Sequence, residues 1–475
     1  MANIRKIEGK NGTSYKITVA VGRDSTGKQK RHYMTWKPTS KMSEKQIEKA
    51  VQKAAFAFEE QIMQGFSPDN RQSFSEYAEY VISLKAKNGA KRRTIERYRE
   101  MLPRINAAIG HIKLKDILPK HLNQLYDNLA EEGIRETPER ATPKKDIATI
   151  MKERKLSAAA LSRQTGIAAS TFAPAIHGNS VSRHTAEIIA AALDFKPETL
   201  FVFQKDNRPL SAKTILEHHR LISTIMSQAE KEMLIQYNPA HRASPPKLEK
   251  REVECFQPEE LQLILACLDK ESIKWRTIIN LLIETGCRRG EIMGLKWEDI
   301  YWEDCLLYIC RSLNYTPQSG IFVDTTKTGE TRYIRVSKEM IDLLRQYELW
   351  YKELKEQSGD LWQETGFVFT KDNGGLMLPD NVTQWLSTFS KKYELPPIHP
   401  HKFRHTMASL MITNRVDVVT VSKRLGHAKV STTTDIYSHA IKEADAQAAA
   451  DYAAFIRKKK TAPVPPKEEP EAVKN

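Results

Sequence analysis

The segment from Ser244 to Glu252 (SPPKLEKRE), near the middle of the chain, carries two adjacent prolines and a run of charges. Proline fixes its own backbone and lacks an amide donor, so a segment of this kind acts as a semi-rigid linker. The chain has 475 residues, which is too long for one hydrophobic core. We therefore expect two halves that fold separately, with further domains inside the first half.

The overall composition is that of a folded protein with a basic balance. Hydrophobic residues make up 40% of the chain and charged residues 28%, as in ordinary globular proteins. The 74 lysines and arginines outnumber the 59 aspartates and glutamates, and the net charge of +15 indicates a polyanionic partner. No apolar run approaches the roughly 18 residues of a membrane span, and the first residues do not form a signal peptide. We expect a cytoplasmic protein without membrane contact.

Residues 1–65 are predicted to form a small β-sheet followed by a helix. Residues 15–21 (YKITVAV) alternate with the period of a strand, and residues 29–36 return as a second strand. Ser43 is a candidate N-cap for the helix. The second strand carries three adjacent basic residues, Lys30, Arg31 and His32. Both a solvated basic hairpin and a strand that contacts DNA fit this pattern.

Helical periodicity follows in residues 72–135 and again in residues 208–243. Helices are expected in the first stretch, including one from Leu118 to Leu129, and the second stretch predicts a long helix starting near Leu210. We expect the two stretches to form one helical domain, although about 70 residues separate them.

The separating segment, residues 142–206, is predicted to be an inserted domain of five short helices. A helix at 161–167 that ends in a glycine turn, followed by a helix at 169–177, is similar to the helix-turn-helix of Cro/repressor-type proteins. The second of these helices has no Arg, Lys, Asn or Gln to pair with base edges, and Pro174 lies beyond its first turn. Base reading, protein contact and simple spacing remain open for this insert.

Short polar motifs gather in residues 253–457, after the linker. They are TGCRRGE at 285–291, KTG at 327–329, HKFRH at 401–405, LGH at 425–427 and DIYSH at 435–439. The candidate catalytic residues in these motifs are Arg288, Lys327, His401, Arg404, His427 and Tyr437. A Pro/Glu-rich tail at 458–475 is expected to be disordered.

These residue types suit a metal-free attack on a phosphodiester. The transition state gathers charge on two non-bridging oxygens, and a guanidinium offers a rigid, permanently charged fork of donors to such an oxygen. Arg404 and one of the neighbours Arg288 and Arg289 could fill these positions. A tyrosine attacks phosphorus once positive surroundings or a base remove its phenolic proton, and His401 or His427 could be that base. The five cysteines form no CxxC pair, so reduced thiols fit better than a disulfide framework or a zinc site. Since the residues suit a metal-free reaction, we expect no metal and no cofactor.

In order and spacing, the motifs resemble those of the tyrosine recombinases, the phage-integrase family. The resemblance implies that Arg288 is the functional arginine of the first motif and that Lys327 is the general acid for the departing 5′ oxygen. It also implies that Tyr437 is the nucleophile and forms a 3′-phosphotyrosine with DNA. Lys327 is expected at the tip of a hairpin between strands at 321–323 and 332–336.

The motifs also predict local geometry and supporting residues. His401 and Arg404 begin a helix after a proline and should project from one face of its first turn. Glu291 is expected to orient other residues and to take no direct part. His405 and His439 are expected to pack or to cap.

The resemblance implies a multidomain, mainly α fold with small β elements. Residues 1–65 would be an arm-type DNA-binding module with a small β-sheet. Residues 72–135 and 208–243 would form a helical core-binding domain, interrupted by the helix-turn-helix insert at 142–206. Residues 253–457 would be a mixed α/β, mostly helical catalytic domain.

The implied function is that of an integrase of a bacterial or phage mobile element, which cuts and rejoins DNA during integration and excision. Double-stranded DNA is the expected partner, with a homotetramer on synapsed sites and DNA-bending or excision factors as candidate accessory partners. The helix from Ala440 to Phe455 is expected to dock on a neighbouring copy. Two alternatives remain: a type IB topoisomerase-like nicking-closing enzyme and a DNA-binding transcriptional regulator.

Overall fold

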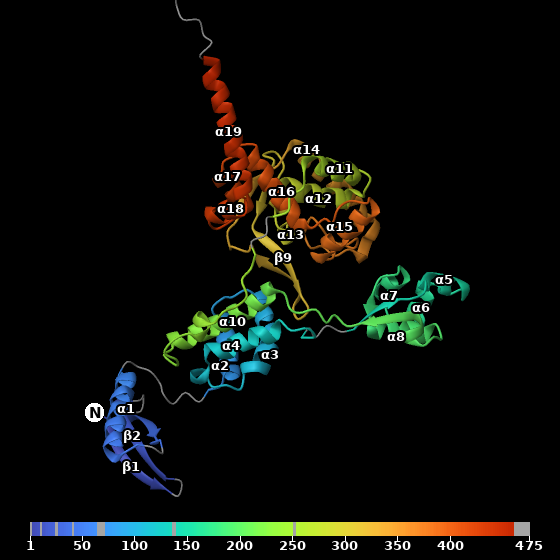
Figure 1. The fold of residues 1–475 in the computed structure, drawn as a ribbon. Coiled ribbons are helices and arrows are strands. Elements are labelled where there is room, and N and C mark those ends of the chain that lie inside the picture. Colours follow the sequence, from blue (N-terminus) through green and yellow to red (C-terminus); the bar gives the residue numbers. More distant parts are fainter. Residues whose placement is uncertain are drawn as a thin grey trace, which may run out of the picture. The chain divides into compact units, whose positions relative to one another are not determined.

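The computed structural model describes residues 2–9, 12–23, 27–39, 42–63, 72–134, 139–249 and 253–459. The chain divides into two compact units, Met1–Glu249 and Lys250–Asn475, each described here by itself (Figure 1). The end of the linker at 250–252 and the tail at 460–475 lie outside the described residues.

The first part of unit 1 is a three-stranded antiparallel sheet covered by one helix. Its elements are β1 (Asn3–Gly9), β2 (Gly12–Arg23), β3 (Gln29–Trp36) and α1 (Glu44–Met63), with strand order β1-β2-β3. Side chains alternate across a strand, so Ile17 and Val19 of β2 are buried together with Phe58 and Ile62 of α1. The strand β1 was not predicted from the sequence.

A helical domain follows, with a single core built from two separate stretches of the chain. Its helices are α2 (Phe74–Lys87), α3 (Arg92–Ile109), α4 (Pro119–Leu129) and α10 (Ala212–Lys231). A capping box starts α2: the Ser73 side chain accepts from the Glu76 amide, and the Glu76 carboxylate accepts from the Ser73 amide. Helix α10 packs against α2 and α3. Residues from both stretches of the chain therefore lie in one core.

The insert enters and leaves this domain at neighbouring points. The Gly133 amide donates to the Asn207 carbonyl at 2.8 Å, and the Leu210 amide donates to the Leu129 carbonyl at 3.4 Å. The five predicted helices are α5 (Ile147–Glu153), α6 (Ala158–Thr165), α7 (Ala169–Ile176), α8 (Arg183–Ala192) and α9 (Pro197–Leu200). A sheet that was not predicted, in the order β5-β4-β6, joins β4 (Arg140–Pro143), β5 (Val181–Ser182) and β6 (Phe201–Gln204), and it begins before residue 142.

Because the two ends of the insert meet, its removal should leave the helical domain folded. We expect replacement of residues 135–206 by a short Gly/Ser linker to change the stability of this domain by about 2 kcal/mol or less, since each doubling of loop length changes the closure free energy by only about 0.6 kcal/mol. Amide hydrogen exchange in α3 and α10 measures this. Loss of protection in both helices would mean that the insert is part of the domain's core.

Unit 2 contains a mostly helical domain with two small sheets. Its longer helices are α11 (Pro258–Leu268), α12 (Ile273–Thr285), α14 (Lys338–Ser358), α15 (Asp380–Lys392), α16 (Pro400–Thr413) and α19 (Ser438–Lys459). Shorter elements are α13 (Arg289–Met293), α17 (Val418–Leu425), α18 (Val430–Ile436), β7 (Ile300–Tyr301), β8 (Leu306–Ile309), β9 (Arg311–Thr316), β10 (Gly320–Thr325) and β11 (Arg332–Arg335). Helix α12 packs against α14 and α16 and carries fully buried apolar side chains.

The predicted hairpin around Lys327 is wrong. Strand β10 pairs with β9, and β11 pairs with β8, so the strands on either side of Lys327 belong to different sheets. The short turn between Thr316 and Gly320 closes a local hairpin, and the buried Ile334 of β11 pairs with the buried Leu307 of β8. Lys327 therefore lies in a turn between two sheets.

The predicted multidomain, mainly helical fold with small sheets is confirmed. In the described residues, no helix has the length and apolar character needed to cross a membrane.

Candidate active site

Left-handed glycines end two helices in unit 2 and set the position of the motif residues that follow. Gly286 ends α12 with φ 62° and Gly426 ends α17 with φ 67°. Glycine adopts this conformation without steric cost. Arg288 thus becomes the N-cap of α13, and His427 follows directly after α17.

Arg404 joins these two helix ends. It lies on the first turns of α16 and is 2% exposed. Its Nη1 donates to the Gly286 carbonyl at 2.9 Å and its Nη2 donates to the Leu425 carbonyl at 2.7 Å. Burial, followed by the charge of Arg288, lowers the pKa of Arg404 to about 10. The guanidinium remains charged at neutral pH and adds positive charge to an enclosed site.

Glu291 is a buried carboxylate shared by two arginines. It accepts from the Arg288 amide at 3.1 Å, from Arg288 Nη1 at 2.9 Å and from Arg332 Nη2 at 2.7 Å. Burial raises the pKa of Glu291, but the charge and hydrogen bonds of Arg332 and Arg288 outweigh it and hold that pKa below its ordinary value. Arg332 also donates to the Arg424 carbonyl at 2.8 Å. Glu291 and Arg332 therefore link the first motif to the end of α17.

Tyr437 lies between α18 and α19, and its side chain is fully buried. Its hydroxyl is 2.9 Å from Nδ1 of His405, which is on α16. Burial raises the pKa of Tyr437 to about 12, although the charge of Arg404 acts in the opposite direction. The phenol is therefore protonated at neutral pH and needs a base or added positive charge before it can attack.

The charges of the two arginines act on two further motif residues, His401 and His427. Burial lowers the pKa of His401, and the charges of Arg404, Arg288 and Lys327 lower it further. Lys327 is exposed on its turn, and this effect on His401 indicates that its charge reaches the site. Burial, followed by Arg404 and Arg288, lowers the pKa of His427 to about 4, and its Nδ1 is 2.8 Å from Thr433 Oγ1.

The neighbour of Arg288 points elsewhere. Arg289 donates a hydrogen bond to the Thr383 hydroxyl and forms an ion pair with Asp380 at 2.6 Å. Arg288 is instead among the charges that act on Arg404, His401 and His427. Arg288, and not Arg289, therefore acts together with Arg404, His401 and His427.

Sequence reasoning missed two residues of this site. His405 was expected to pack or to cap, but it is bonded to the Tyr437 hydroxyl. Its position four residues after His401, on the same helix face, was the available signal, and their rings lie 5.3 Å apart. Arg332 follows the KTG motif in β11, and nothing in the sequence pairs it with Glu291.

Two family models match this chain. Residues 254–444 match the phage integrase family, and residues 146–206 match the Cro/C1-type HTH DNA-binding domain. Both families had been inferred from the motifs, and both are confirmed.

Relatives and solved structures agree with these matches. The ICEBs1 integrase of Bacillus subtilis is 29% identical over 233 residues, covering 48% of this chain and 62% of the relative. A XerC-like tyrosine recombinase of Caldanaerobacter subterraneus is 27% identical over 250 residues, covering 49% of this chain and 63% of the relative. The chain thus spans less than two thirds of these curated relatives.

A Tn1549 transposon integrase solved in complex with circular intermediate DNA has the same fold. It superposes with a TM-score of 0.53 at 15% identity, covering 80% of this chain and 99% of that chain. Taken with the motif geometry, these matches identify residues 254–444 as a phage integrase family domain and residues 146–206 as a Cro/C1-type helix-turn-helix domain.

Proposed function

We propose that this protein is a site-specific DNA recombinase, an integrase that cuts and rejoins double-stranded DNA to integrate and excise a mobile element. The observation that carries this proposal is the grouping of a buried tyrosine, two arginines and three histidines in one site. The integrases among the relatives support the assignment to a mobile element.

Each residue has a role in the proposed reaction. Arg288 and Arg404 hold the non-bridging oxygens of the scissile phosphate, and His401 and His427 donate further hydrogen bonds to it. Tyr437 attacks phosphorus and forms a 3′-phosphotyrosine, while Lys327 protonates the departing 5′ oxygen. The phosphotyrosine keeps the energy of the broken bond, so rejoining requires neither a nucleotide nor another cofactor.

The N-terminal sheet supports a second contact with DNA. Arg5 and Lys16 are paired across β1 and β2, and Ala20 pairs with Arg31 on β3. Strand alternation puts these residues on the face opposite Ile17 and Val19, and Lys16 Nζ lies 4.4 Å from the centre of the Tyr33 ring. Basic side chains on an exposed sheet suit a phosphate backbone and make binding dependent on salt.

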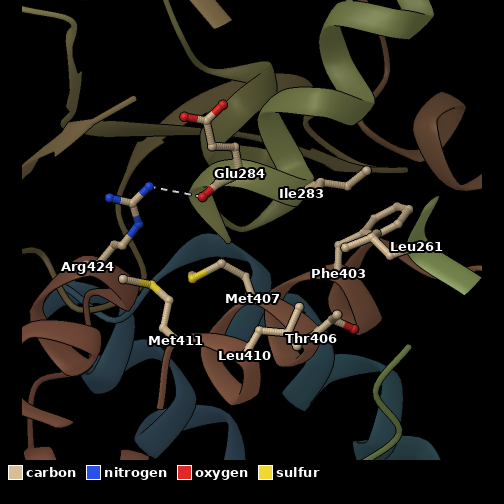
Figure 2. A pocket seen from close by; sticks show the side chains of 9 residues that line it. All are labelled: Leu261, Ile283, Glu284, Phe403, Thr406, Met407, Leu410, Met411 and Arg424. Carbon is tan, nitrogen blue, oxygen red and sulfur yellow. Dashed lines mark hydrogen bonds between the residues drawn. The ribbon is translucent and has the colours of Figure 1, made fainter. Parts of the chain in front are cut away.

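Assembly into a homotetramer is supported by helix α19 and by a pocket elsewhere in unit 2. Every residue from Asp445 to Ile456 is exposed, including the large side chains of Tyr452 (67%) and Phe455 (60%). The pocket of about 280 Å³ is lined mainly by apolar side chains, with Arg424 and Glu284 at one end and Leu261 and Phe403 at the other (Figure 2). We propose that α19 of a second copy occupies this pocket.

Truncation of α19 tests this assembly. Deletion of residues 445–475 keeps Ala440 and Ile441, which pack around Tyr437. We expect cooperative assembly on paired DNA sites to fall by about tenfold or more, since each large apolar side chain is worth about 1.5–3 kcal/mol when buried. Binding to a single site should change little. Equal loss in both gel-shift measurements would contradict docking between copies.

Covalent trapping tests the function itself. Wild-type protein is incubated in EDTA with nicked DNA that carries the end sequence of its own element, and protein–DNA adducts are separated under denaturing conditions. A metal-independent adduct through Tyr437 is the expected result. Tight binding of this DNA without any adduct would refute the proposed reaction.

A further inference from the structure

The Tyr437 hydroxyl has one side-chain hydrogen bond in the described part of the chain, and its partner is His405. With the hydroxyl as donor, Nδ1 of His405 is the acceptor and Nε2 carries the ring proton. Resting on the proposed function, we propose that His405 is the general base that takes the phenolic proton when Tyr437 attacks DNA. His405 is then a catalytic residue in addition to the six predicted from the motifs.

The geometry favours His405 over the other two histidines of the site. The distance of 2.9 Å between Nδ1 and the phenolic oxygen is within reach of direct proton transfer. His427 instead directs its Nδ1 to Thr433 at 2.8 Å. His401 contacts the ring of His405 edge-on, with ring centres 5.3 Å apart, and the Tyr437 hydroxyl has its hydrogen bond with His405.

The charge state of His405 suits this role. Burial is the main cause that lowers its pKa to about 4, and the charges of His401 and Arg404 add to the effect. The ring is therefore neutral at pH 7, and its Nδ1 lone pair accepts the tyrosine hydrogen bond and can take the proton. When a phosphate binds between Arg288 and Arg404, its negative charge offsets these positive neighbours and makes the ring a stronger base.

The proton balance of the step is complete. The phenolic O–H bond breaks, its proton passes to His405 Nδ1, and the phenolic oxygen forms a bond to phosphorus. The bond from phosphorus to the 5′ oxygen breaks, and that oxygen takes a proton from Lys327. Rejoining reverses both transfers, so the base and the acid each return to their starting state.

A change of the leaving group in the DNA distinguishes the role of a general base from that of a general acid. DNA with sulfur in place of the 5′ bridging oxygen releases a thiolate, which needs no proton because a thiol has a pKa near 8.5. Lys327→Gln should cleave ordinary DNA slowly and the sulfur-substituted DNA at a rate close to wild type. His405→Asn should cleave both DNAs about 10²- to 10⁴-fold more slowly than wild type.

Asparagine is the informative replacement, because its side-chain oxygen can accept the tyrosine hydrogen bond but cannot take the proton. His399→Asn, an exposed position before the same helix, is the matched control and should cleave like wild type. A melting temperature measured for each variant excludes unfolding, and His405→Gln provides a second replacement if His405→Asn does not fold.

The outcomes distinguish this inference from the proposed function. An adduct from wild type together with undiminished cleavage by His405→Asn would overturn the role of His405 and leave the recombinase assignment intact. Rescue of His405→Asn by sulfur-substituted DNA would assign the residue to the leaving group instead. If wild type forms no adduct, the proposed function itself fails.

Discussion

Tyr437→Phe is expected to abolish the covalent adduct and to lower strand cleavage by at least about 10⁴-fold, as removal of a catalytic nucleophile does elsewhere. Phenylalanine keeps the ring that packs among Met407, Val421 and Leu425 and removes the atom that attacks phosphorus. The cost in stability should be small, about 0.5–1.5 kcal/mol, because one hydrogen bond to His405 is lost. Single-turnover cleavage of nicked DNA and chemical denaturation measure the two effects.

A matched substitution controls for the loss of any tyrosine hydroxyl. Tyr393→Phe, at the end of α15 and outside the candidate site, should cleave DNA at the wild-type rate. DNA binding by Tyr437→Phe should equal that of wild type, since the cationic residues are unchanged. A persistent adduct in Tyr437→Phe would show that another residue is the nucleophile.

Much of this site was predictable because its residues sit at local structural signals. The glycines after Thr285 and Leu425 mark the ends of α12 and α17, and proline at the start of α16 marks a helix N-terminus. Local backbone preferences therefore set where Arg288, His427 and Arg404 lie relative to the ends of the helices.

The features that were not predicted from the sequence depend on contacts between residues that are distant in the sequence. The residues 321–323 and 332–336 resemble a hairpin locally, but their pairing was decided by β9 and β8, which bury Leu313 and Leu307. Strand β1 has mostly exposed side chains and thus shows little apolar pattern. The hydrogen bond between His405 and Tyr437 joins α16 to the residue between α18 and α19, and no local pattern specifies how these segments pack.

The second large effect is expected for Arg404→Lys. Lysine keeps the positive charge, but all its donors are on one nitrogen atom, whereas Arg404 reaches the carbonyls of Gly286 and Leu425 from two separate nitrogens. One ammonium is therefore not expected to reach both carbonyls and a phosphate oxygen. We expect cleavage to fall by about 10²- to 10³-fold, as for the loss of a preorganised donor. The free energy of unfolding should fall by about 1–3 kcal/mol, because a buried, charged hydrogen bond is lost.

Arg289→Lys provides the matched control for this prediction. Arg289 is bound to Thr383 and Asp380, so the same substitution there should leave cleavage nearly unchanged. Assays at a temperature where both variants are fully folded separate the catalytic loss from the structural one. If the two variants lost activity equally, or if the loss in Arg404→Lys vanished at low temperature, Arg404 would act by holding α12 and α17 in place. A loss confined to Arg404→Lys in the folded state would mean that this buried guanidinium acts on the phosphate, because both variants carry the same charge and differ in what their donors can reach.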